Sequence, residues 1–275
     1  MLRFPPTEPP GRRGGTTLFY HDFDPVAFRL GPLAVRWYGL AYLAGFAAAY
    51  GVLRRAVRRG RLPLEPQAVG DLVTWLALGL VLGARAGYVL FYNLPYFAAH
   101  PLRAFAFWEG GMSFHGGLAG VGLAAWLFAR RHSLGLLSIS DVLALAAPFG
   151  LLFGRLANFV NGELYGRVTS LPWGVVFPAG GPLPRHPSQL YEALLQGPIL
   201  WAWVAWVSRR FPGRTGAATA AFLGGYGVLR ILVELVREPD PQLGFLLGPL
   251  TMGQLLSAVL VAAGLWLWQR ARPSP

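Results

Sequence analysis

The sequence predicts an all-α polytopic membrane protein with seven transmembrane helices, and three observations lead to this fold class. Of its 275 residues, 54% are hydrophobic and 13% are charged, whereas soluble domains carry about 25% charged residues. The mean hydropathy is positive, at +0.44. The 24 basic residues are all arginine, and half of them cluster directly after apolar runs. This pattern is typical of membrane helices joined by cationic loops.

Each predicted helix is an apolar segment close to the roughly 20 residues that cross a bilayer. In chain order, the segments are Gly31–Leu53, Asp71–Phe91, Met112–Ala129, Ile139–Phe159, Ser188–Val207, Gly216–Val236 and Gly248–Trp268.

The arginine clusters assign a direction to these helices. They follow the first, third, fifth and seventh segments, as Arg54, Arg55, Arg58, Arg59 and Arg61, then Arg130 and Arg131, then Arg209, Arg210 and Arg214, then Arg270 and Arg272. Cationic loops stay in the cytoplasm. We therefore expect the N-terminus outside and the C-terminus in the cytoplasm, an arrangement that requires an odd number of spans.

The domain organisation follows from this topology. Residues 1–30 are predicted to be an N-terminal arm outside the membrane, and 31–272 a single seven-helix domain. Met1 to Thr17 contain no apolar run of the signal-peptide kind, so no cleaved signal is expected. Residues 160–187 are rich in Gly and Pro and predict a small extracytoplasmic head. Asn93 to Gly111 is a second long outer loop, and we expect it to include a short interfacial helix.

Composition also excludes several kinds of site. The chain has no Cys, which rules out disulfides and a catalytic thiol of its own. The five histidines are scattered without metal-ligand spacing, so we expect no metal and no cofactor. The arginines mark topology, so we expect no nucleic acid as a partner.

Ionisable groups in the predicted helices share one depth. With the direction assigned above, Tyr38, Arg85, His115, Arg155 and Arg230 fall in the outer halves of five different helices. Charged groups in a bilayer are costly and usually functional. The sequence therefore predicts one shared polar cavity in the outer leaflet.

The most polar stretch is Gly154 to Gly166, which ends the fourth segment. Arg155 and Asn158 are three residues apart and share a helix face, and Asn161, Glu163 and Gly166 follow. A guanidinium group suits a phosphate, so one interpretation is an anion clamp. The other is an Arg155–Glu163 ion pair that only holds a helix end. The residues leave both open.

A second polar stripe lies on the sixth segment, where Arg230, Glu234 and Arg237 recur at helical spacing. Arg230 either contacts a second phosphate oxygen or pairs within the helix with Glu234. Arg237 is interpreted as a surface residue that anchors lipid headgroups.

Three further residues are ambiguous. His115 precedes two glycines that permit close approach, and it either acts as a base or makes a structural hydrogen bond. Tyr38 is a site residue or part of an aromatic belt, and Arg85 a site residue or a partner of a carboxylate. His186 is expected to open a helix whose caps are Ser188 and Gln189.

Together these stretches resemble the bacterial phosphatidylglycerol–prolipoprotein diacylglyceryl transferases. The similarity lies in motifs that run in order from the first to the sixth segment: Arg36-Trp37-Tyr38-Gly39-Leu40, Gly83-Ala84-Arg85-Ala86-Gly87-Tyr88, Ser113-Phe114-His115-Gly116-Gly117, Gly154 to Gly166, His186-Pro187-Ser188-Gln189-Leu190-Tyr191-Glu192 and Arg230-Ile231-Leu232-Val233-Glu234. One departure is Ala157, where the family motif usually has Gly.

The resemblance implies a reaction and its residues. It implies transfer of a diacylglyceryl group from phosphatidylglycerol to the lipobox cysteine of a preprolipoprotein, on the outer face of the bacterial inner membrane. The signal peptide delivers the thiol, and glycerol phosphate is released. The catalytic positions of the family fall on His115, Arg155 and Arg230. Its other functional positions fall on Tyr38, Asn158, Glu163, Gly166 and Glu234, which we expect to bind substrate. Arg85 and Asn161, in the same motifs, are further candidates for substrate binding.

Two other functions fit parts of the sequence. A transporter or channel would use a polar cavity, but it would place charges along a path through both leaflets. A non-catalytic lipid-binding protein would need only arginines at headgroup depth. The one-sided depth of the charges and the resemblance favour the transferase.

Overall fold

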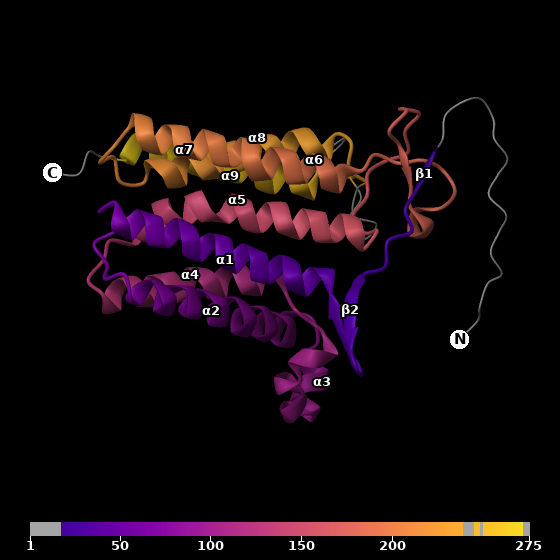
Figure 1. Cartoon of the computed structure of the whole chain (residues 1–275), viewed down its shortest axis with the longest axis horizontal. Helices are drawn as coiled ribbons and strands as arrows, with labels where there is room; N and C mark the ends of the chain where they lie inside the picture. The colour runs from indigo at the N-terminus through magenta and orange to yellow at the C-terminus, as the bar shows by residue number, and fades with distance from the viewer. Residues whose placement is uncertain (1–17, 239–244, 248–249, 272–275) are drawn as a thin grey trace.

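Long helices that run along one axis make up most of the structure, a computed structural model that describes residues 18–238, 245–247 and 250–271 (Figure 1). The long helices are α1 (Trp37–Arg58), α2 (Ala68–Phe91), α4 (Phe114–Arg131), α5 (Leu136–Val160), α8 (Ala217–Glu234) and α9 (Met252–Arg270). A seventh rod consists of α6 (Ser188–Leu194), the π-helical η4 (Leu195–Ile199) and α7 (Leu200–Arg210). Within the described residues, these rods overlap the predicted segments in chain order.

Four of these helices, α2, α5, α8 and α9, are long and apolar enough to cross a membrane. Large apolar side chains such as Leu43, Leu82 and Val259 are more than half exposed along the rods. Such exposure is unfavourable in water and suits a lipid surround. The prediction of a mostly helical membrane protein is confirmed.

The start of the first predicted helix is wrong. Residues Leu33–Arg36 form a strand, β3, that pairs antiparallel with β2 (Val26–Leu30), and α1 begins only at Trp37. The short apolar run Leu33-Ala34-Val35 suits a strand as well as a helix, because runs of this length do not distinguish the two.

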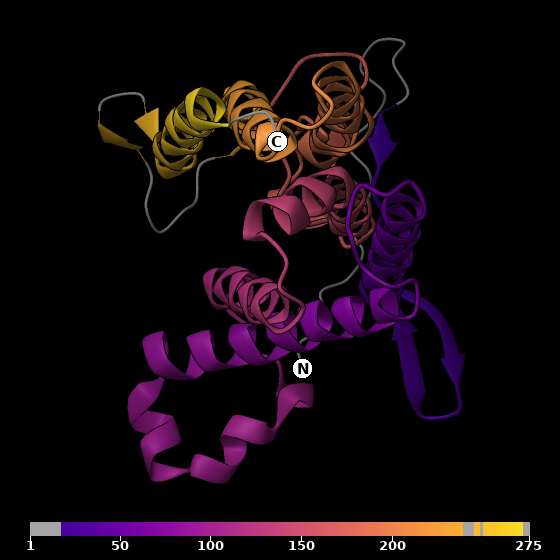
Figure 2. The same ribbon diagram turned by 90° about the vertical axis from the view of Figure 1, so that its left-hand side faces the viewer.

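The rods pack mainly as three pairs: α2 with α4, α1 with α5, and α8 with α9 (Figures 1 and 2). The α6–α7 rod joins the second and third pairs by contacting α5 and α8. The first pair, with the residues that connect it, is called the α2–α4 hairpin below (68–131). Figure 2 shows this hairpin and α9 on opposite sides of the bundle.

Two apolar cores lie toward one end of the bundle, where α1 ends and α5 and α8 begin. One gathers Leu53, Leu72, Phe128 and Ile139 between α1, α2, α4 and α5. The other packs Leu200, Val204 and Ala217 between α7 and α8. Both cores consist of apolar side chains, and the arginine-rich polar cluster described below lies in the other half of the helices.

Short elements cover that other end. The strand β1 (Phe19–Tyr20) pairs in parallel with β4 (Val175–Val176), so the described part of the predicted arm is joined to the 160–187 region. Residues Met1 to Thr17 lie outside the described residues. The remaining short elements are η3 (Pro178–Gly180), β5 (Phe245–Leu247) and β6 (Leu250–Thr251).

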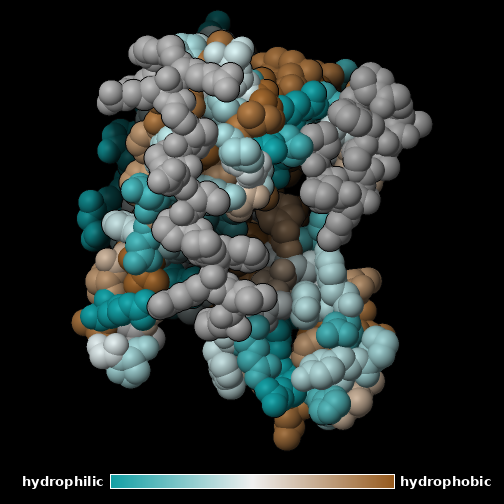
Figure 3. Space-filling view, turned by 90° about the vertical axis from the view of Figure 1, so that its right-hand side faces the viewer, coloured by the Kyte–Doolittle hydropathy of each residue, from teal (hydrophilic) through white to brown (hydrophobic). Residues whose placement is uncertain are grey.

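The predicted short helix in the Asn93–Gly111 loop is present. The loop consists of α3 (Leu94–Ala99), η1 (Pro101–Phe105) and η2 (Phe107–Glu109), and it projects beyond the bundle (Figure 1). Leu102 and Trp108 are each 84% exposed. Seen end-on, this face of the molecule mixes hydrophilic and hydrophobic residues (Figure 3).

Candidate active site

The end of α5 forms a chain of carboxamide and carboxylate contacts. The Arg155 guanidinium donates to Asn158 Oδ1 at 3.3 Å, and Asn158 Nδ2 donates to Glu163 Oε1 at 2.7 Å. Asn161 Nδ2 reaches the same Glu163 oxygen at 3.3 Å. Asn158 is buried and Glu163 is exposed, so the network runs from the helix interior to the surface. The predicted neighbours in this motif are therefore brought together.

The centre of the site is Glu192 on α6, which is fully buried at 0% exposure. Its Oε2 atom lies 2.7 Å from Arg155 Nε, and its Oε1 atom lies 3.0 Å from Arg237 Nη1 and 3.4 Å from Arg230 Nη1. Three guanidinium groups from α5, α8 and the residues after α8 therefore converge on one carboxylate. Removing a charge from water is costly, so such burial requires close counter-charges.

Glu234 supplies the second carboxylate. It forms an ion pair with Arg230 one helical turn away and lies 3.9 Å from Arg237 Nε. Its Oε2 atom accepts a hydrogen bond of 2.9 Å from Thr251 Oγ1 at the start of α9. We call Arg155, Arg230, Arg237, Glu192 and Glu234 the arginine cluster.

The arginine cluster is cationic. Three guanidinium groups and two carboxylates leave one positive charge in excess. Arg230 Nη1 is buried and makes no hydrogen bond, although it lies 3.4 Å from Glu192 Oε1 in an ion pair. A phosphate oxygen could accept a hydrogen bond from this nitrogen and balance the excess charge.

Two of the predicted interactions are corrected here. Arg155 pairs with Glu192 and not with Glu163, because Glu163 lies on the outer side of Asn158. Arg237 is not a surface anchor for lipid: its side chain is 17% exposed and paired with both carboxylates. The chain after α8 folds back, and Arg167 N donates to Val236 O, which carries Arg237 into the cluster.

The first residues of α6 hold the loop that follows α5 and carries Glu163. Ser188 and Gln189 do not cap α6 as predicted. Ser188 Oγ donates to Leu164 O at 3.1 Å, and Gln189 Nε2 donates to Glu163 O at 2.6 Å. These bonds stabilise a strained turn in which Leu164 has a φ of 57°. The helix that carries Glu192 thus also fixes the loop that carries Glu163.

Gly166 is required by packing. A Cβ atom there would lie 2.5 Å from Val236 O and 2.7 Å from His186 Cβ, because this segment runs between the chain before α6 and the chain after α8. Ala157, the departure from the family motif, is accommodated as a buried residue of α5.

His21 packs against the last turn of α5 and the glycine that follows it. Its ring is buried among Phe23, Phe159 and Phe177, and its Nε2 atom makes a hydrogen bond of 2.5 Å with Phe159 O. The ring also lies against Gly162, whose φ is +67°. His21 lies outside the motifs that predicted the site.

The remaining predicted site residues lie apart from the cluster. His115 is exposed in the first turn of α4, and its ring lies edge-on to the ring of Phe114. The Tyr38 ring lies 5.3 Å from the Tyr42 ring on α1, at an interplanar angle of 58°. Arg85 is buried in the α2–α4 hairpin and donates to backbone carbonyl groups. Among the described residues, no hydrogen bond, ion pair or ring contact joins these three to the arginine cluster.

His186 belongs to the wall of the head region. Burial lowers the pKa of its imidazole below the usual 6.5, so the ring is neutral at pH 7. Its Nδ1 atom lies 3.3 Å from the Tyr191 hydroxyl, which accepts a 2.7 Å hydrogen bond from Trp173 Nε1. His186 therefore joins the head to α6.

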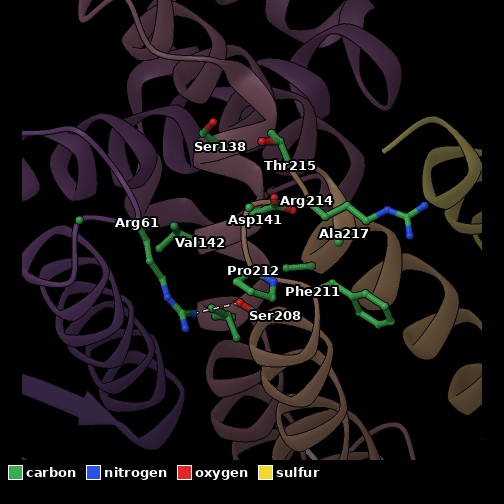
Figure 4. Close-up of a pocket in the computed structure, with 14 residues that line it drawn as sticks. Arg61, Ser138, Asp141, Val142, Ser208, Phe211, Pro212, Arg214, Thr215 and Ala217 are labelled. Carbon is green, nitrogen blue, oxygen red and sulfur yellow. Dashed lines mark hydrogen bonds between the residues drawn. The ribbon is translucent and has the colours of Figure 1, made fainter. Parts of the chain in front are cut away.

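A pocket of about 370 Å³ lies at the opposite end of the bundle (Figure 4). Arg61 and Ser208 hydrogen-bond across its rim. Asp141 accepts from the backbone N–H groups of Gly216 and Thr219 and from the Thr219 hydroxyl. The carboxylate caps α8, so this pocket is part of how α5 and α8 are joined and is remote from the arginine cluster.

Sequence reasoning missed the most buried member of the cluster. Glu192 was visible as a carboxylate inside an apolar segment, and such residues in membrane helices are usually paired and functional. The π-helical turn η4 follows it, and Gln196 Nε2 lies 3.4 Å from Glu192 Oε2. Turns of this type are frequent at functional sites.

Comparison with known proteins identifies the family. The family model for prolipoprotein diacylglyceryl transferase matches residues 25–270. The chain belongs to this family. It is 56% identical over 246 residues to the phosphatidylglycerol–prolipoprotein diacylglyceryl transferase of Geobacter sulfurreducens, an alignment that covers 90% of this chain and 94% of the relative.

Other relatives agree. The enzyme of the same description from Nitratidesulfovibrio vulgaris is 53% identical over 257 residues, covering 93% of this chain and 96% of its own length. The one from Rhizobium meliloti is 50% identical over 262 residues, covering 92% of this chain and 94% of its own length. The chain is thus a transferase of this family and a multi-pass membrane protein.

Proposed function

We propose that this chain transfers the diacylglyceryl group of phosphatidylglycerol to the lipobox cysteine of a preprolipoprotein. The signal peptide presents that cysteine on the extracytoplasmic side of the bacterial inner membrane. The proposal includes seven spans with the N-terminus outside. The clustered arginines at the ends of α1, α4 and α7 and at the pocket end of α9 support this direction.

The arginine cluster is the observation that carries the proposal. It offers a net positive charge, a buried Arg230 nitrogen that makes no hydrogen bond and three planar guanidinium groups within one site. Phosphatidylglycerol is an anion whose phosphate matches these donors. Arg155 and Arg230 bind the phosphate, Glu234 orients Arg230, and Asn158, Asn161 and Glu163 line the outer side with Gly166.

The reaction is a substitution at carbon. The thiol sulfur attacks the glyceryl carbon that carries the phosphate ester, a thioether bond forms, and the C–O bond breaks. The electron pair leaves with the phosphate oxygen as glycerol phosphate, where the arginines stabilise the new charge. A free thiol has a pKa of about 8.5 and reacts as thiolate, so His115 accepts its proton. No metal or cofactor takes part.

The substrate must bridge two parts of the molecule. His115 is on α4, whereas the arginine cluster is on α5, α6 and α8. The glyceryl carbon lies between them, and Tyr38 on α1 lines the same side. His115 is exposed, as a base that receives a second substrate needs to be.

The test is a mass measurement on a cysteine-containing signal peptide incubated with phosphatidylglycerol and purified enzyme. We expect the mass of a diacylglyceryl group to be added. Arg155→Ala should lower the rate about 10² to 10³-fold, the usual effect of losing one charge-stabilising donor. Arg131→Gln, at the exposed far end of α4, is the matched control and should keep the rate.

Three results would contradict the proposal. Absence of any mass shift would leave a protein that only binds lipid. Unchanged turnover in Arg155→Ala would remove the phosphate clamp, and unchanged turnover in His115→Gln would remove the base.

A further inference from the structure

Arg85 is held more completely by the backbone than the arginines of the cluster. The residue is 5% exposed on α2. Its Nε donates to Ala104 O at 2.8 Å and its Nη2 to Arg103 O at 2.6 Å. Its Nη1 donates to Gly110 O at 2.5 Å and to Gly111 O at 3.2 Å. The rings of Phe97 and Phe107 lie 5.2 and 6.0 Å from its guanidinium carbon.

This arrangement leaves little of the guanidinium for a substrate. The group has five N–H donors, and four of them point at the carbonyl oxygens just named. Arg230, by contrast, is held by the side-chain carboxylates of Glu192 and Glu234, and its buried Nη1 lies 3.4 Å from Glu192 Oε1 without making a hydrogen bond. Arg85 is therefore built to hold protein, whereas Arg230 is built to receive an anion.

The four carbonyl groups belong to both limbs of the loop that leads into α4. Arg103 and Ala104 lie on its outgoing limb, and Gly110 and Gly111 on its returning limb. Two residues later, Ser113 N donates to Ala84 O at 2.9 Å, beside Arg85. Ser113 Oγ then caps α4 by accepting from Gly116 N. His115 lies in this first turn.

The two helices are also in backbone contact at this level. A Cβ atom on Gly87 would lie 2.7 Å from Gly116 Cα, and one on Gly116 would overlap the carbonyl oxygen of Gly83. Glycines spaced four apart allow such approach between membrane helices. The first turn of α4 is thus fixed to α2 by backbone contact, and the loop that leads into it is fixed to α2 by Arg85.

We propose that Arg85 is a positioning residue for His115: it does not bind the lipid, but ties the loop 103–111 and the start of α4 to α2 and so sets the place of the catalytic imidazole. This inference rests on the proposed role of His115 as the base. It replaces direct substrate contact as the role expected for Arg85 from the sequence.

The test is a double-mutant cycle with kinetics on both substrates. Arg85→Lys keeps the charge but loses the planar fork that reaches both limbs. We expect kcat to fall about 10² -fold, the usual effect of a misplacement of about 1 Å. The KM for phosphatidylglycerol should stay within about twofold, because the arginine cluster is untouched. In the His115→Gln background, Arg85→Lys should cost almost nothing further, because the base is already gone.

A second variant avoids changing Arg85. Gly111 has a φ of +74°, and a Cβ atom there would lie 3.0 Å from Arg85 Nη1 and 2.5 Å from the Tyr88 ring. Gly111→Ala should therefore disturb the same tie and give the same loss in kcat alone. Gly122→Ala, on α4 where a Cβ atom meets nothing within 4 Å, is the matched control.

Each other outcome overturns the inference. A raised KM for lipid with unchanged kcat in Arg85→Lys would mean direct lipid binding. Full additivity with His115→Gln would mean a general structural role. If His115→Gln alone keeps the wild-type rate, both the proposed base and this inference fail. If His115→Gln loses activity but Arg85→Lys is fully additive with it, only this inference fails.

Discussion

The arginine cluster and the α2–α4 hairpin hold their charged groups in opposite ways. In the cluster, guanidinium groups face two carboxylates and retain an excess positive charge. In the hairpin, the one buried guanidinium faces backbone carbonyls, and the helices meet through glycines. Side-chain ion pairs can exchange partners with a substrate anion, whereas backbone ties cannot. The arginine cluster is therefore suited to binding an anion, and the α2–α4 hairpin to keeping its helices in fixed positions.

The largest effect is expected at the centre of the cluster. Glu192→Gln removes the carboxylate shared by three arginines, and breaking a buried pair on one side costs about 3 to 5 kcal/mol. We expect that loss in the free energy of unfolding in mixed micelles, together with a fall of transfer by at least about 10²-fold.

The control for Glu192 is Glu238→Gln. Glu238 also pairs with an arginine, Arg185, at 3.0 Å, but its side chain is 45% exposed. Its loss should cost no more than about 1 kcal/mol. Equal effects of the two substitutions would mean that burial does not distinguish the cluster.

The second effect tests the backbone contact in the hairpin. A Cβ atom on Gly120 would overlap the carbonyl oxygen of Gly79 and lie 2.9 Å from Gly83 Cα. Gly120→Ala should therefore separate α2 from α4 and lower the free energy of unfolding by about 1 to 3 kcal/mol. kcat should fall with it, because His115 moves.

Gly122 on the same helix is the matched position. Nothing lies within 4 Å of a Cβ atom there, so Gly122→Ala should be neutral or stabilise by about 0.5 to 1 kcal/mol through helix propensity. If both alanines behave alike, propensity and not close contact governs the hairpin.

The sequence predicted the parts of this comparison that are local in the chain. Apolar runs of spanning length identified the rods, and Arg155, Asn158 and Glu163 were recognised because they lie within one motif. The predicted first helix began too early because the short apolar run Leu33-Ala34-Val35 fits a strand as well as a helix. The role of each residue inside the site depends on partners, and here the sequence was less informative.

Partners far along the chain explain what was missed. Glu192 meets Arg155 and Arg230 only because α6 packs between α5 and α8. Arg237 was predicted at the surface since polar residues follow it, but the bridge between Gly166 and Arg237 brings it inward. Arg85 lies in a motif that suggested a site residue. Its hydrogen-bond acceptors are backbone carbonyl groups of the 94–111 loop, and only the path of that loop reveals them.

A smaller effect is expected where the cluster meets α9. Thr251 Oγ1 donates to Glu234 and also caps α9 by accepting from Gln254 N at 3.2 Å. Thr251→Val removes both bonds and should cost about 1 to 2 kcal/mol of unfolding free energy, with a rise in the KM for phosphatidylglycerol as Arg230 loses its fixed partner. Thr251→Ser keeps the hydroxyl and should restore both values; a failure to do so would assign the effect to the methyl group.

The smallest effect is expected at the tip of the hairpin, where an ion pair of the same chemistry lies in the open. Arg103 and Glu109 pair with side-chain exposures of 55% and 39%, and the backbone carbonyl of Arg103 already binds Arg85. Arg103→Gln keeps that carbonyl and loses only the ion pair, so the unfolding free energy should change by less than about 1 kcal/mol and less still in high salt. Turnover should be unchanged, because the tie to α2 runs through the backbone. A loss of kcat in Arg103→Gln would show that the side-chain pair, and not Arg85, holds the loop.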